Sequence, residues 1–310
     1  MNELLRELEL YAKKEPTAVA FGVFDGVHLG HKHVFNTLQK AAAKRDLVPI
    51  VVTLANHPLS VLRPEVEIHM LTSLDQRLHL IKDAGIEYVA PLTFTKAISQ
   101  LSAKDFMQTL KNALHMEHFV AGQDVSIGHN RAGDLKVLTE LGSQIGYSIE
   151  TVEQFNLHEL PVRSTSIRKA LNQGDLTTVT QLLGRYFSLI GPVIQGEGIG
   201  KELLGYPTAN INVSPSQAIP AEGIYATWIK FNDQLLPSAT SIGKKPTFHT
   251  DAPLTVETFI LDFKRNLYGE HLELEFVERI RGQEKFSTIE LLSAEIEKDI
   301  VETKRILGVL

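Results

Sequence analysis

The sequence predicts an α/β protein with two dissimilar domains, the second of which is rich in β-strands and ends in a helix. In the first half, apolar runs with β-branched residues alternate with segments of helical periodicity. This alternation is typical of a parallel sheet with helices on both faces. From about residue 187 the apolar segments become short and two-periodic, with glycine and proline between them. Several such strands indicate a small β-barrel or a sandwich.

The elements of the first half follow one another in regular alternation. The predicted strands are 17–24, 47–54, 86–94, 118–124 and 147–155. The predicted helices between them are 31–46, 73–85, 102–114 and 134–146. Ser102 stands where a helix N-cap is expected, and Gly85 follows the last periodic residue of its helix.

The second half contains one especially clear strand, residues 271–280. Its apolar residues Leu272, Leu274 and Phe276 face one way, and the glutamates between them face the other. A helix follows near the end of the chain. Its apolar stripe consists of Ile289, Leu292, Ile296 and Ile300, and we expect it to pack on the strands. The change of pattern near Gly184 divides the chain into domains of residues 1–185 and 186–310.

Composition excludes several classes of protein. The 310-residue chain has a net charge of -6 and no cysteine, which rules out disulfides and thiolate sites and fits a reducing compartment. An acidic chain without a basic stripe argues against nucleic acid as a partner. The first residues lack the apolar centre of a signal peptide, and no segment is long enough to span a bilayer. We therefore expect a cytoplasmic protein with no membrane partner.

Histidines cluster where the first strand gives way to a helix. His28 and His31 flank Gly30 at this junction, where helix N-termini of parallel sheets bind anions. Two histidines one turn apart can donate hydrogen bonds to one phosphate chain, which matters most when charge builds up during phosphoryl or nucleotidyl transfer. A metal site is a weaker interpretation, because the expected third ligand is missing from the motif. The third interpretation is an ordinary, solvent-exposed helix end without a ligand.

A second anion site is indicated further along. Ser164 and Thr165 precede a helical segment, and Arg168 lies one turn into it. Hydroxyls, free backbone N–H groups and a guanidinium at one helix start suit phosphate. The alternative is an ordinary helix cap.

A glycine-rich segment opens the second half. It contains Gly196, Gly198, Gly200 and Lys201, and such loops cradle phosphates through backbone N–H groups. It is not a Walker motif, and a plain cluster of turns is the alternative. Thr208 and Asn210 follow on one face of an extended segment, as a pair of neutral oxygens suited to Mg²⁺ and phosphate.

These motifs together resemble one family. "GVFDGVHLGH" and "RSTSIR" resemble the nucleotidylyltransferase module of bacterial bifunctional riboflavin kinase/FAD synthetases, and "GEGIGKELLGYPTANI" resembles the riboflavin kinase signature. The resemblance continues through "VETFILDF" to the C-terminal helix. It implies a Rossmann-like sheet domain, a β-barrel, and two reactions. The barrel would convert riboflavin and ATP to FMN and ADP, and the sheet domain would convert FMN and ATP to FAD and pyrophosphate. Both reactions would need Mg²⁺.

The resemblance also implies roles for particular residues. His28 and His31 would stabilise the α-phosphate and the departing pyrophosphate, and Glu257 would be the general base of the kinase. ATP phosphates in the first domain would be held by Gly22, Phe24, Asp25, Gly30, Ser164, Thr165 and Arg168. FMN or nucleotide would contact His57, Pro58, Asp124 and Arg131. ATP in the barrel would contact Gly196, Gly198, Gly200, Lys201, Thr208 and Asn210, the last two also holding Mg²⁺.

The chain departs from the family pattern at several positions. Related sequences carry "F-x-P-H-P" and "D-F-x-F-G" where this chain has "LANHP" and "DVSIG", and Ser241 and Lys245 replace asparagine and arginine. The first two changes remove rings that could stack on flavin or adenine. Three alternatives follow: a kinase with weakened or lost adenylyltransferase activity, a transferase acting on another phosphate, and a flavin-sensing regulator.

Overall fold

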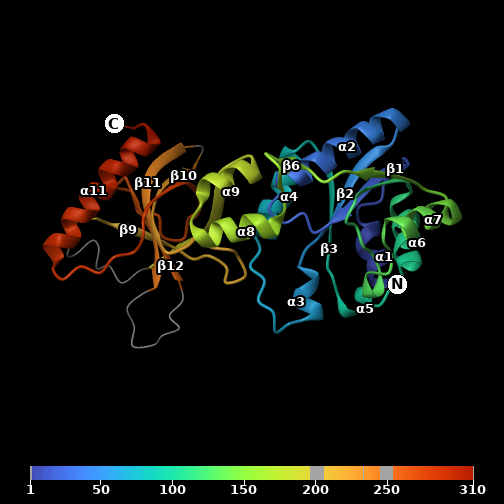
Figure 1. Cartoon of the computed structure of the whole chain (residues 1–310), viewed down its shortest axis with the longest axis horizontal. Helices are drawn as coiled ribbons and strands as arrows, with labels where there is room; N and C mark the ends of the chain where they lie inside the picture. The colour runs from blue at the N-terminus through green and yellow to red at the C-terminus, as the bar shows by residue number, and fades with distance from the viewer. Residues whose placement is uncertain (1, 196–205, 233, 245–253, 310) are drawn as a thin grey trace. The chain divides into compact units, whose positions relative to one another are not determined.

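The computed structural model describes residues 2–195, 206–232, 234–244 and 254–309 (Figure 1). Two compact units make up the chain, Met1–Ser164 and Thr165–Leu310. The predictions for Gly196, Gly198, Gly200, Lys201 and Lys245 concern positions outside the described residues.

The first unit is built on a five-stranded parallel sheet with strand order β3-β2-β1-β4-β5. All five predicted strands are confirmed: β1 (Thr17–Gly22), β2 (Val48–Leu54), β3 (Tyr88–Leu92), β4 (Met116–Gly122) and β5 (Ser148–Val152). The strand order reverses direction at β1 and β4, so the connections that leave these two strands diverge. In open parallel sheets this switch point opens a crevice at the carboxyl ends of the strands.

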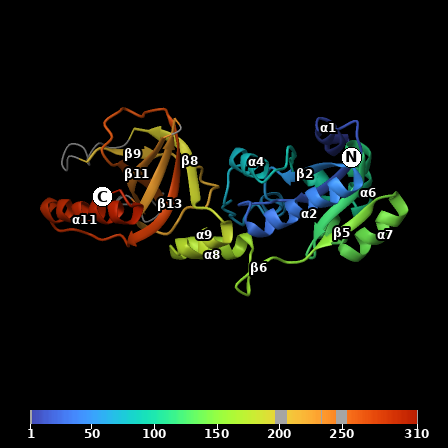
Figure 2. The ribbon, with the colours of Figure 1, turned by 90° about the horizontal axis from the view of Figure 1, so that it is seen from above.

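Helices cover both faces of this sheet, as Figures 1 and 2 show. The helices are α1 (Asn2–Glu9), α2 (Leu29–Arg45), α3 (Pro58–Leu62), α4 (Leu74–Asp83), α5 (Lys96–Ser99), α6 (Ala103–Leu114), η1 (His129–Arg131) and α7 (Leu135–Ile145). Ser102 caps α6 as predicted, accepting the Asp105 N–H. A short hairpin, β6 (Asn156–Leu157) and β7 (Leu160–Pro161), follows β5.

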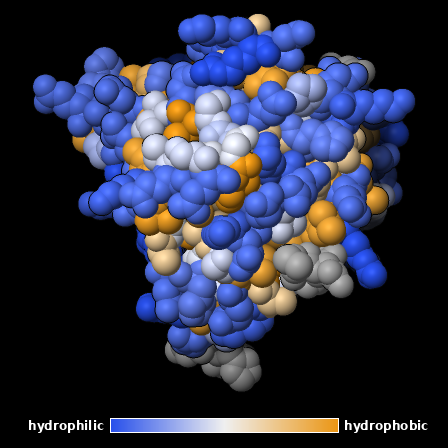
Figure 3. Space-filling model, turned by 90° about the vertical axis from the view of Figure 1, so that its right-hand side faces the viewer, coloured by the Kyte–Doolittle hydropathy of each residue, from blue (hydrophilic) through white to orange (hydrophobic). Residues whose placement is uncertain are grey.

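The two faces of the sheet bury separate cores. Val19 and Phe119 belong to a cluster that includes α1, α6 and α7, whereas their neighbours Ala18 and Val120 belong to a cluster that includes α2 and α4. Adjacent residues of a strand point to opposite faces, so continuous apolar strands such as these can bury both. The surface in Figure 3 is mostly hydrophilic, with scattered apolar side chains. Among the described residues, no helix is both long and apolar enough to cross a membrane.

The second unit contains a closed six-stranded barrel with strand order β10-β11-β12-β9-β8-β13. Helix α8 (Ser164–Gln173) leads into it, followed by α9 (Leu176–Leu183). The strands are β8 (Phe187–Ile194), β9 (Thr208–Ile211), β10 (Gly223–Phe231), β11 (Gln234–Lys244), β12 (Leu254–Ile260) and β13 (His271–Arg281). Of the two predicted architectures, a barrel or a sandwich, the second unit has the barrel.

The barrel interior is part apolar and part hydroxylic. Leu272, Leu274 and Phe276 are buried, which confirms the predicted alternation of β13. A chain of hydroxyls lies beside them, formed by Thr227, Ser238, Thr240 and Thr258, and all four residues are fully buried. Thr227 Oγ1 lies 2.7 Å from both Ser238 Oγ and Thr240 Oγ1, and Thr240 donates to Thr258. Each buried hydroxyl thus has a partner, which removes the desolvation penalty of an unpaired polar group.

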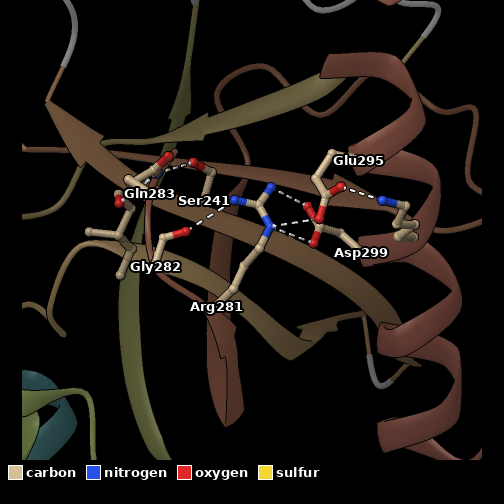
Figure 4. A network of polar contacts seen from close by, with 8 residues as sticks. Ser241, Arg281, Gly282, Gln283, Glu295 and Asp299 are labelled. Carbon is tan, nitrogen blue, oxygen red and sulfur yellow. Dashed lines mark hydrogen bonds and ion pairs between the residues drawn. The ribbon is translucent and has the colours of Figure 1, made fainter. Parts of the chain in front are cut away.

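The terminal helix α11 (Ile289–Leu307) packs against β10, β11 and β13. The predicted stripe is wrong at Ile289, which is 49% exposed, while Asp299 and Thr303 are the buried residues of the helix. Asp299 is buried because it takes part in an ion pair. Arg281 on β13 donates from Nε and Nη2 to the two Asp299 carboxylate oxygens at 2.9 and 2.7 Å, as Figure 4 shows. A buried carboxylate can face the barrel because this guanidinium meets it bidentately.

Candidate active sites

The loop after β1 is held by its own aspartate. The Asp25 carboxylate is buried and accepts hydrogen bonds from the backbone N–H groups of Leu71 and Thr72 and from the Thr72 hydroxyl. Thr72 Oγ1 also accepts the Gly26 N–H. These contacts tie the loop to the segment just before α4, so both carboxylate oxygens are engaged in fixing the loop.

The same loop is strained. Phe24 and Val27 have positive φ angles of 50° and 40°, a conformation that is unfavourable for a bulky or β-branched residue. The Phe24 ring folds back over Gly22, where an added Cβ would lie 3.1 Å from it. Strained backbone persists only where the surroundings impose it, and such positions cluster at functional sites.

The loop delivers His28 to the start of α2. His28 is 5% exposed and caps the helix, with Nδ1 accepting the His31 N–H at 3.3 Å. Because Nδ1 is the acceptor, the neutral ring carries its hydrogen on Nε2. The His31 ring stacks on the His28 ring with centroids 3.5 Å apart, and the edge of Phe24 contacts His31 at 5.2 Å between centroids. Two imidazoles therefore stand together at a helix N-terminus.

The two predicted phosphate motifs meet at this point. Ser164 donates to the Asp25 carbonyl oxygen at 2.9 Å, although 139 residues separate them in sequence. Gly30 allows the segment before Ser164 to lie close to the start of α2. A Cβ at position 30 would lie 3.1 Å from the Val162 carbonyl oxygen and 3.2 Å from the His28 ring. Thr165, which is exposed, and Arg168, which is half-buried, follow on α8, the helix that continues into the second unit.

The remaining predicted residues of the first unit lie at the carboxyl ends of neighbouring strands. His57 follows β2 and caps α3 by accepting the Leu59 N–H, and Pro58 is the first residue of that helix. Asp124 is exposed just after β4. Arg131 is exposed in η1 and donates from Nε to Ser126. These ends share one edge of the sheet with His28.

Two of the departures from the family pattern fall in the core. Leu54 and Ile127 are each 3% exposed within the cluster beneath α6, and Val125 packs against it. Asn56, where relatives have proline, exchanges two hydrogen bonds with the backbone of Phe94. Leu54 and Ile127 thus contribute to the core of this chain, while stacking of aromatic rings on a ligand at these positions stays a prediction for relatives that carry them.

Sequence reasoning missed Arg77. This residue of α4 is 1% exposed and donates to the carbonyl oxygens of Val23, Leu54 and Ala55 at 2.6, 2.7 and 3.0 Å. Burial lowers the pKa of its guanidinium, and the nearby Asp25 charge partly opposes that shift. The sequence around Arg77 does not distinguish it from a solvent-exposed arginine on a helix.

The second candidate site is a row of side chains across three strands of the barrel. Asn210 on β9 is the cross-strand partner of Glu257 on β12, and Glu257 is in turn the partner of Ser241 on β11. Directly opposed residues in antiparallel strands project from the same face, with Cβ atoms roughly 5 Å apart. Val256 and Thr258 are buried, whereas Glu257 between them is half-buried, so the row lies on the outer face of the barrel. Thr208 shares that face with Asn210.

Gln283 borders this row. Its amide nitrogen donates to Ser241 Oγ and to the Ile242 carbonyl oxygen, both at 2.9 Å. The side chain lies over Gly243, where an added Cβ would come within 2.8 Å of it. Figure 4 shows Gln283 following Arg281 at the end of β13, next to the ion pair with Asp299. The same strand end thus anchors the terminal helix and borders the row.

Fold and sites define a class: a transferase of phosphoryl and nucleotidyl groups, with a parallel-sheet nucleotide domain followed by a small barrel. Family comparison gives the particulars, because residues 10–166 match the FAD synthetase family and residues 183–307 match the riboflavin kinase family. The chain belongs to the bifunctional riboflavin kinase/FMN adenylyltransferase family, and it carries both domains.

Relatives of the same description span nearly the whole chain. The protein of Listeria monocytogenes is 35% identical, over 92% of this chain and 91% of its own length. That of Bacillus subtilis is 33% identical, over 93% and 92%. A crystal structure from Streptococcus pneumoniae, described as a macrolide-efflux protein, has a TM-score of 0.86 and 27% identity over 96% of each chain. That description concerns the Streptococcus pneumoniae protein, while its fold extends over both units of this chain.

Proposed function

We propose that residues 1–185 adenylylate FMN through His28 and His31 and that residues 186–310 phosphorylate riboflavin through Glu257. The observation that carries the first assignment is the 2.9 Å contact between Ser164 and the Asp25 carbonyl. It joins the only two sequence segments that we predicted to bind phosphate in that domain. Because the FAD synthetase and riboflavin kinase matches are separate in sequence, each reaction is assigned its own site.

Adenylyl transfer needs hydrogen-bond donors more than a base. The phosphate of FMN is ionised at neutral pH and can attack the α-phosphorus of ATP directly, which expels pyrophosphate. Charge builds on the phosphate oxygens and on the leaving group, and preorganised donors stabilise it. His28 supplies Nε2–H at a helix N-terminus, since its Nδ1 is committed to the His31 N–H. His31, Ser164, Thr165 and Arg168 complete the donor set.

The flavin side of the first site would be formed by the ends of β2 and β4. His57 and Pro58 follow β2, Asp124 follows β4, and Arg131 lies beyond it. The crevice between such strand ends is where ligands bind in open parallel sheets. The buried positions of Leu54 and Ile127 favour retained adenylyl transfer over the alternative of a weakened enzyme, since these changes alter core packing.

Phosphorylation of riboflavin needs a base. The ribityl 5′-hydroxyl has a high pKa, and its proton must leave as the oxygen attacks the γ-phosphorus of ATP. Glu257 is the carboxylate of the outer row, between Asn210 and Ser241. Its half-buried position is compatible with accepting a proton from a bound alcohol.

The donor set of the barrel suits Mg²⁺. Thr208 and Asn210 offer neutral oxygens on one face of β9, and Glu257 is opposite Asn210. Mg²⁺ is commonly held by few protein oxygens together with substrate phosphates, so Thr208 and Asn210 would hold it. When bound, the ion neutralises charge on the phosphate oxygens. Riboflavin, FMN and ATP are the expected substrates, and the cysteine-free composition fits the cytoplasm.

Product analysis of two variants tests the assignment. Purified protein is incubated with riboflavin, ATP and Mg²⁺, and the flavins are separated by chromatography. His28→Ala should accumulate FMN, because kcat for FAD formation should fall by about 100-fold. Glu257→Gln should form no FMN from riboflavin yet convert supplied FMN to FAD. Loss of both products in either folded variant would contradict the division of labour.

A further inference from the structure

One arginine is buried beneath the first site. Arg77 is the largest fully buried side chain in the described part of the chain, and removing a cation from water costs several kcal/mol. Such burial is tolerated only where hydrogen bonds compensate for it. The hydrogen-bond partners of Arg77 therefore indicate its structural role.

The guanidinium bridges the ends of two adjacent strands. Nη1 donates to the Val23 carbonyl, just past the end of β1, and to the Leu54 carbonyl at the end of β2. Nη2 donates to the Ala55 carbonyl. All three acceptors lie where the strand ladder ends and the functional loops begin. A planar fork can hold carbonyls from two strands at once, whereas the single ammonium of lysine cannot reproduce that geometry.

Both loops lead directly to candidate site residues. Val23 begins the strained loop that ends at His28, and Ala55 precedes Asn56 and His57. The Thr72 contacts to Asp25 and Gly26 hold the same strained loop from the start of α4. The segment from Leu71 to Arg77 therefore fixes the phosphate-handling loop and the flavin-side loop relative to each other.

We infer that Arg77 is a positioning residue for adenylyl transfer, which sets the separation between the His28 loop and the His57 loop. The inference rests on the proposed function, because it presumes that these loops carry ATP and FMN. The attacking FMN oxygen must meet the α-phosphorus in line, and a misplacement of about 1 Å can cost about 100-fold in rate. Loss of Arg77 should therefore lower kcat, while each substrate alone keeps its own contacts.

The test compares Arg77→Met with Ile81→Ala, a control on the same helix. Ile81 is fully buried in the core beneath α2 and α4, and its side chain has no polar group that could hold either loop by hydrogen bonds. Both variants are assayed at a temperature at which circular dichroism shows them folded. Arg77→Met should lose about 100-fold in kcat for FAD formation, with KM for ATP and FMN changed less than about threefold. Ile81→Ala should keep kcat within about threefold despite an equal or larger loss of thermal stability.

Riboflavin phosphorylation by the same molecules provides an internal measure of folded protein. It should be unchanged in both variants. Equal losses of FAD formation in Arg77→Met and Ile81→Ala, or a normal kcat in Arg77→Met, would overturn the inference. If Arg77→Met does not fold, Arg77→Lys decides, because it retains the charge and should still lose about tenfold. A normal kcat in Arg77→Lys then overturns the inference, whereas a normal kcat for FAD formation in His28→Ala would instead overturn the proposed function.

Discussion

Asp25 and His28 lie three residues apart in the loop after β1 and serve it differently. The Asp25 carboxylate accepts hydrogen bonds from Leu71 and Thr72, which fixes the strained loop. His28 uses Nδ1 for the helix cap and thereby acquires a defined donor at Nε2. Backbone contacts therefore set the role of each residue in this loop, and we propose His28 as the group that touches phosphate.

A residue-scale prediction concerns the hydroxyl chain inside the barrel. Thr240 Oγ1 connects Thr227 to Thr258. Thr240→Val retains the shape but leaves the Thr258 hydroxyl without its donor, so the free energy of unfolding should fall by about 1–3 kcal/mol. The free energy of unfolding is measured by urea denaturation. Thr255→Val is the control, because Thr255 is half-buried and donates to the Gly243 carbonyl outside the hydroxyl chain. An equal or smaller loss in Thr240→Val would show that the hydroxyl chain contributes nothing.

At the scale of elements, the β6–β7 hairpin departs from the usual turn chemistry. Its two turn residues, His158 and Glu159, have φ angles of 46° and 66°. Two-residue hairpin turns of this kind favour asparagine and glycine, because other side chains are strained at positive φ. Glu159→Gly should therefore raise the free energy of unfolding by about 0.5–1 kcal/mol.

The control for this prediction places glycine on the neighbouring strand. Asn156→Gly, where the backbone has no positive φ, should destabilise by about 0.5–1 kcal/mol. The two variants are compared by their urea midpoints. If both shift in the same direction, relief of backbone strain does not explain the effect of Glu159→Gly.

Elements were more predictable than sites. The five strands of the sheet and the Ser102 cap follow from local periodicity and capping chemistry, which act over a few residues. Arg77 could not be recognised, since its three carbonyl partners lie at or just past the ends of β1 and β2, far from it in sequence. The same holds for Asp299 on α11, whose burial depends on Arg281 from another element. Contacts between elements decide these residues, and local pattern does not encode them.

For the whole molecule, acid stability should depend on a buried histidine of the sheet. His118 on β4 is fully buried, with Nδ1 2.7 Å from Ser148 Oγ and Nε2 3.5 Å from a Glu150 oxygen. Burial and the nearby Arg45 lower the pKa of His118 from 6.5, and Glu150 partly opposes them. The unfolded chain therefore binds this proton more readily, so the free energy of unfolding should fall as the pH drops from 6.5 toward the folded pKa.

His118→Asn isolates this contribution. The difference in unfolding free energy between the wild type and the variant should be constant above pH 6.5 and should shrink below it, because only the wild type carries the penalty. Glu150→Gln should steepen the fall in the wild-type background, since Glu150 supports the charged imidazole. A difference that is independent of pH would show that His118 does not titrate on unfolding.

The central claim is that two separate sites carry out the two reactions, and mixing the two variants tests it most directly. Glu257→Gln and His28→Ala are combined with riboflavin, ATP and Mg²⁺, and FAD is measured against each variant alone. Glu257→Gln alone should form no FAD from riboflavin and His28→Ala alone should form it about 100-fold more slowly than the wild type. The mixture should form FAD readily, because FMN made by one variant is adenylylated by the other. A mixture that accumulates FMN and forms no FAD would contradict the account.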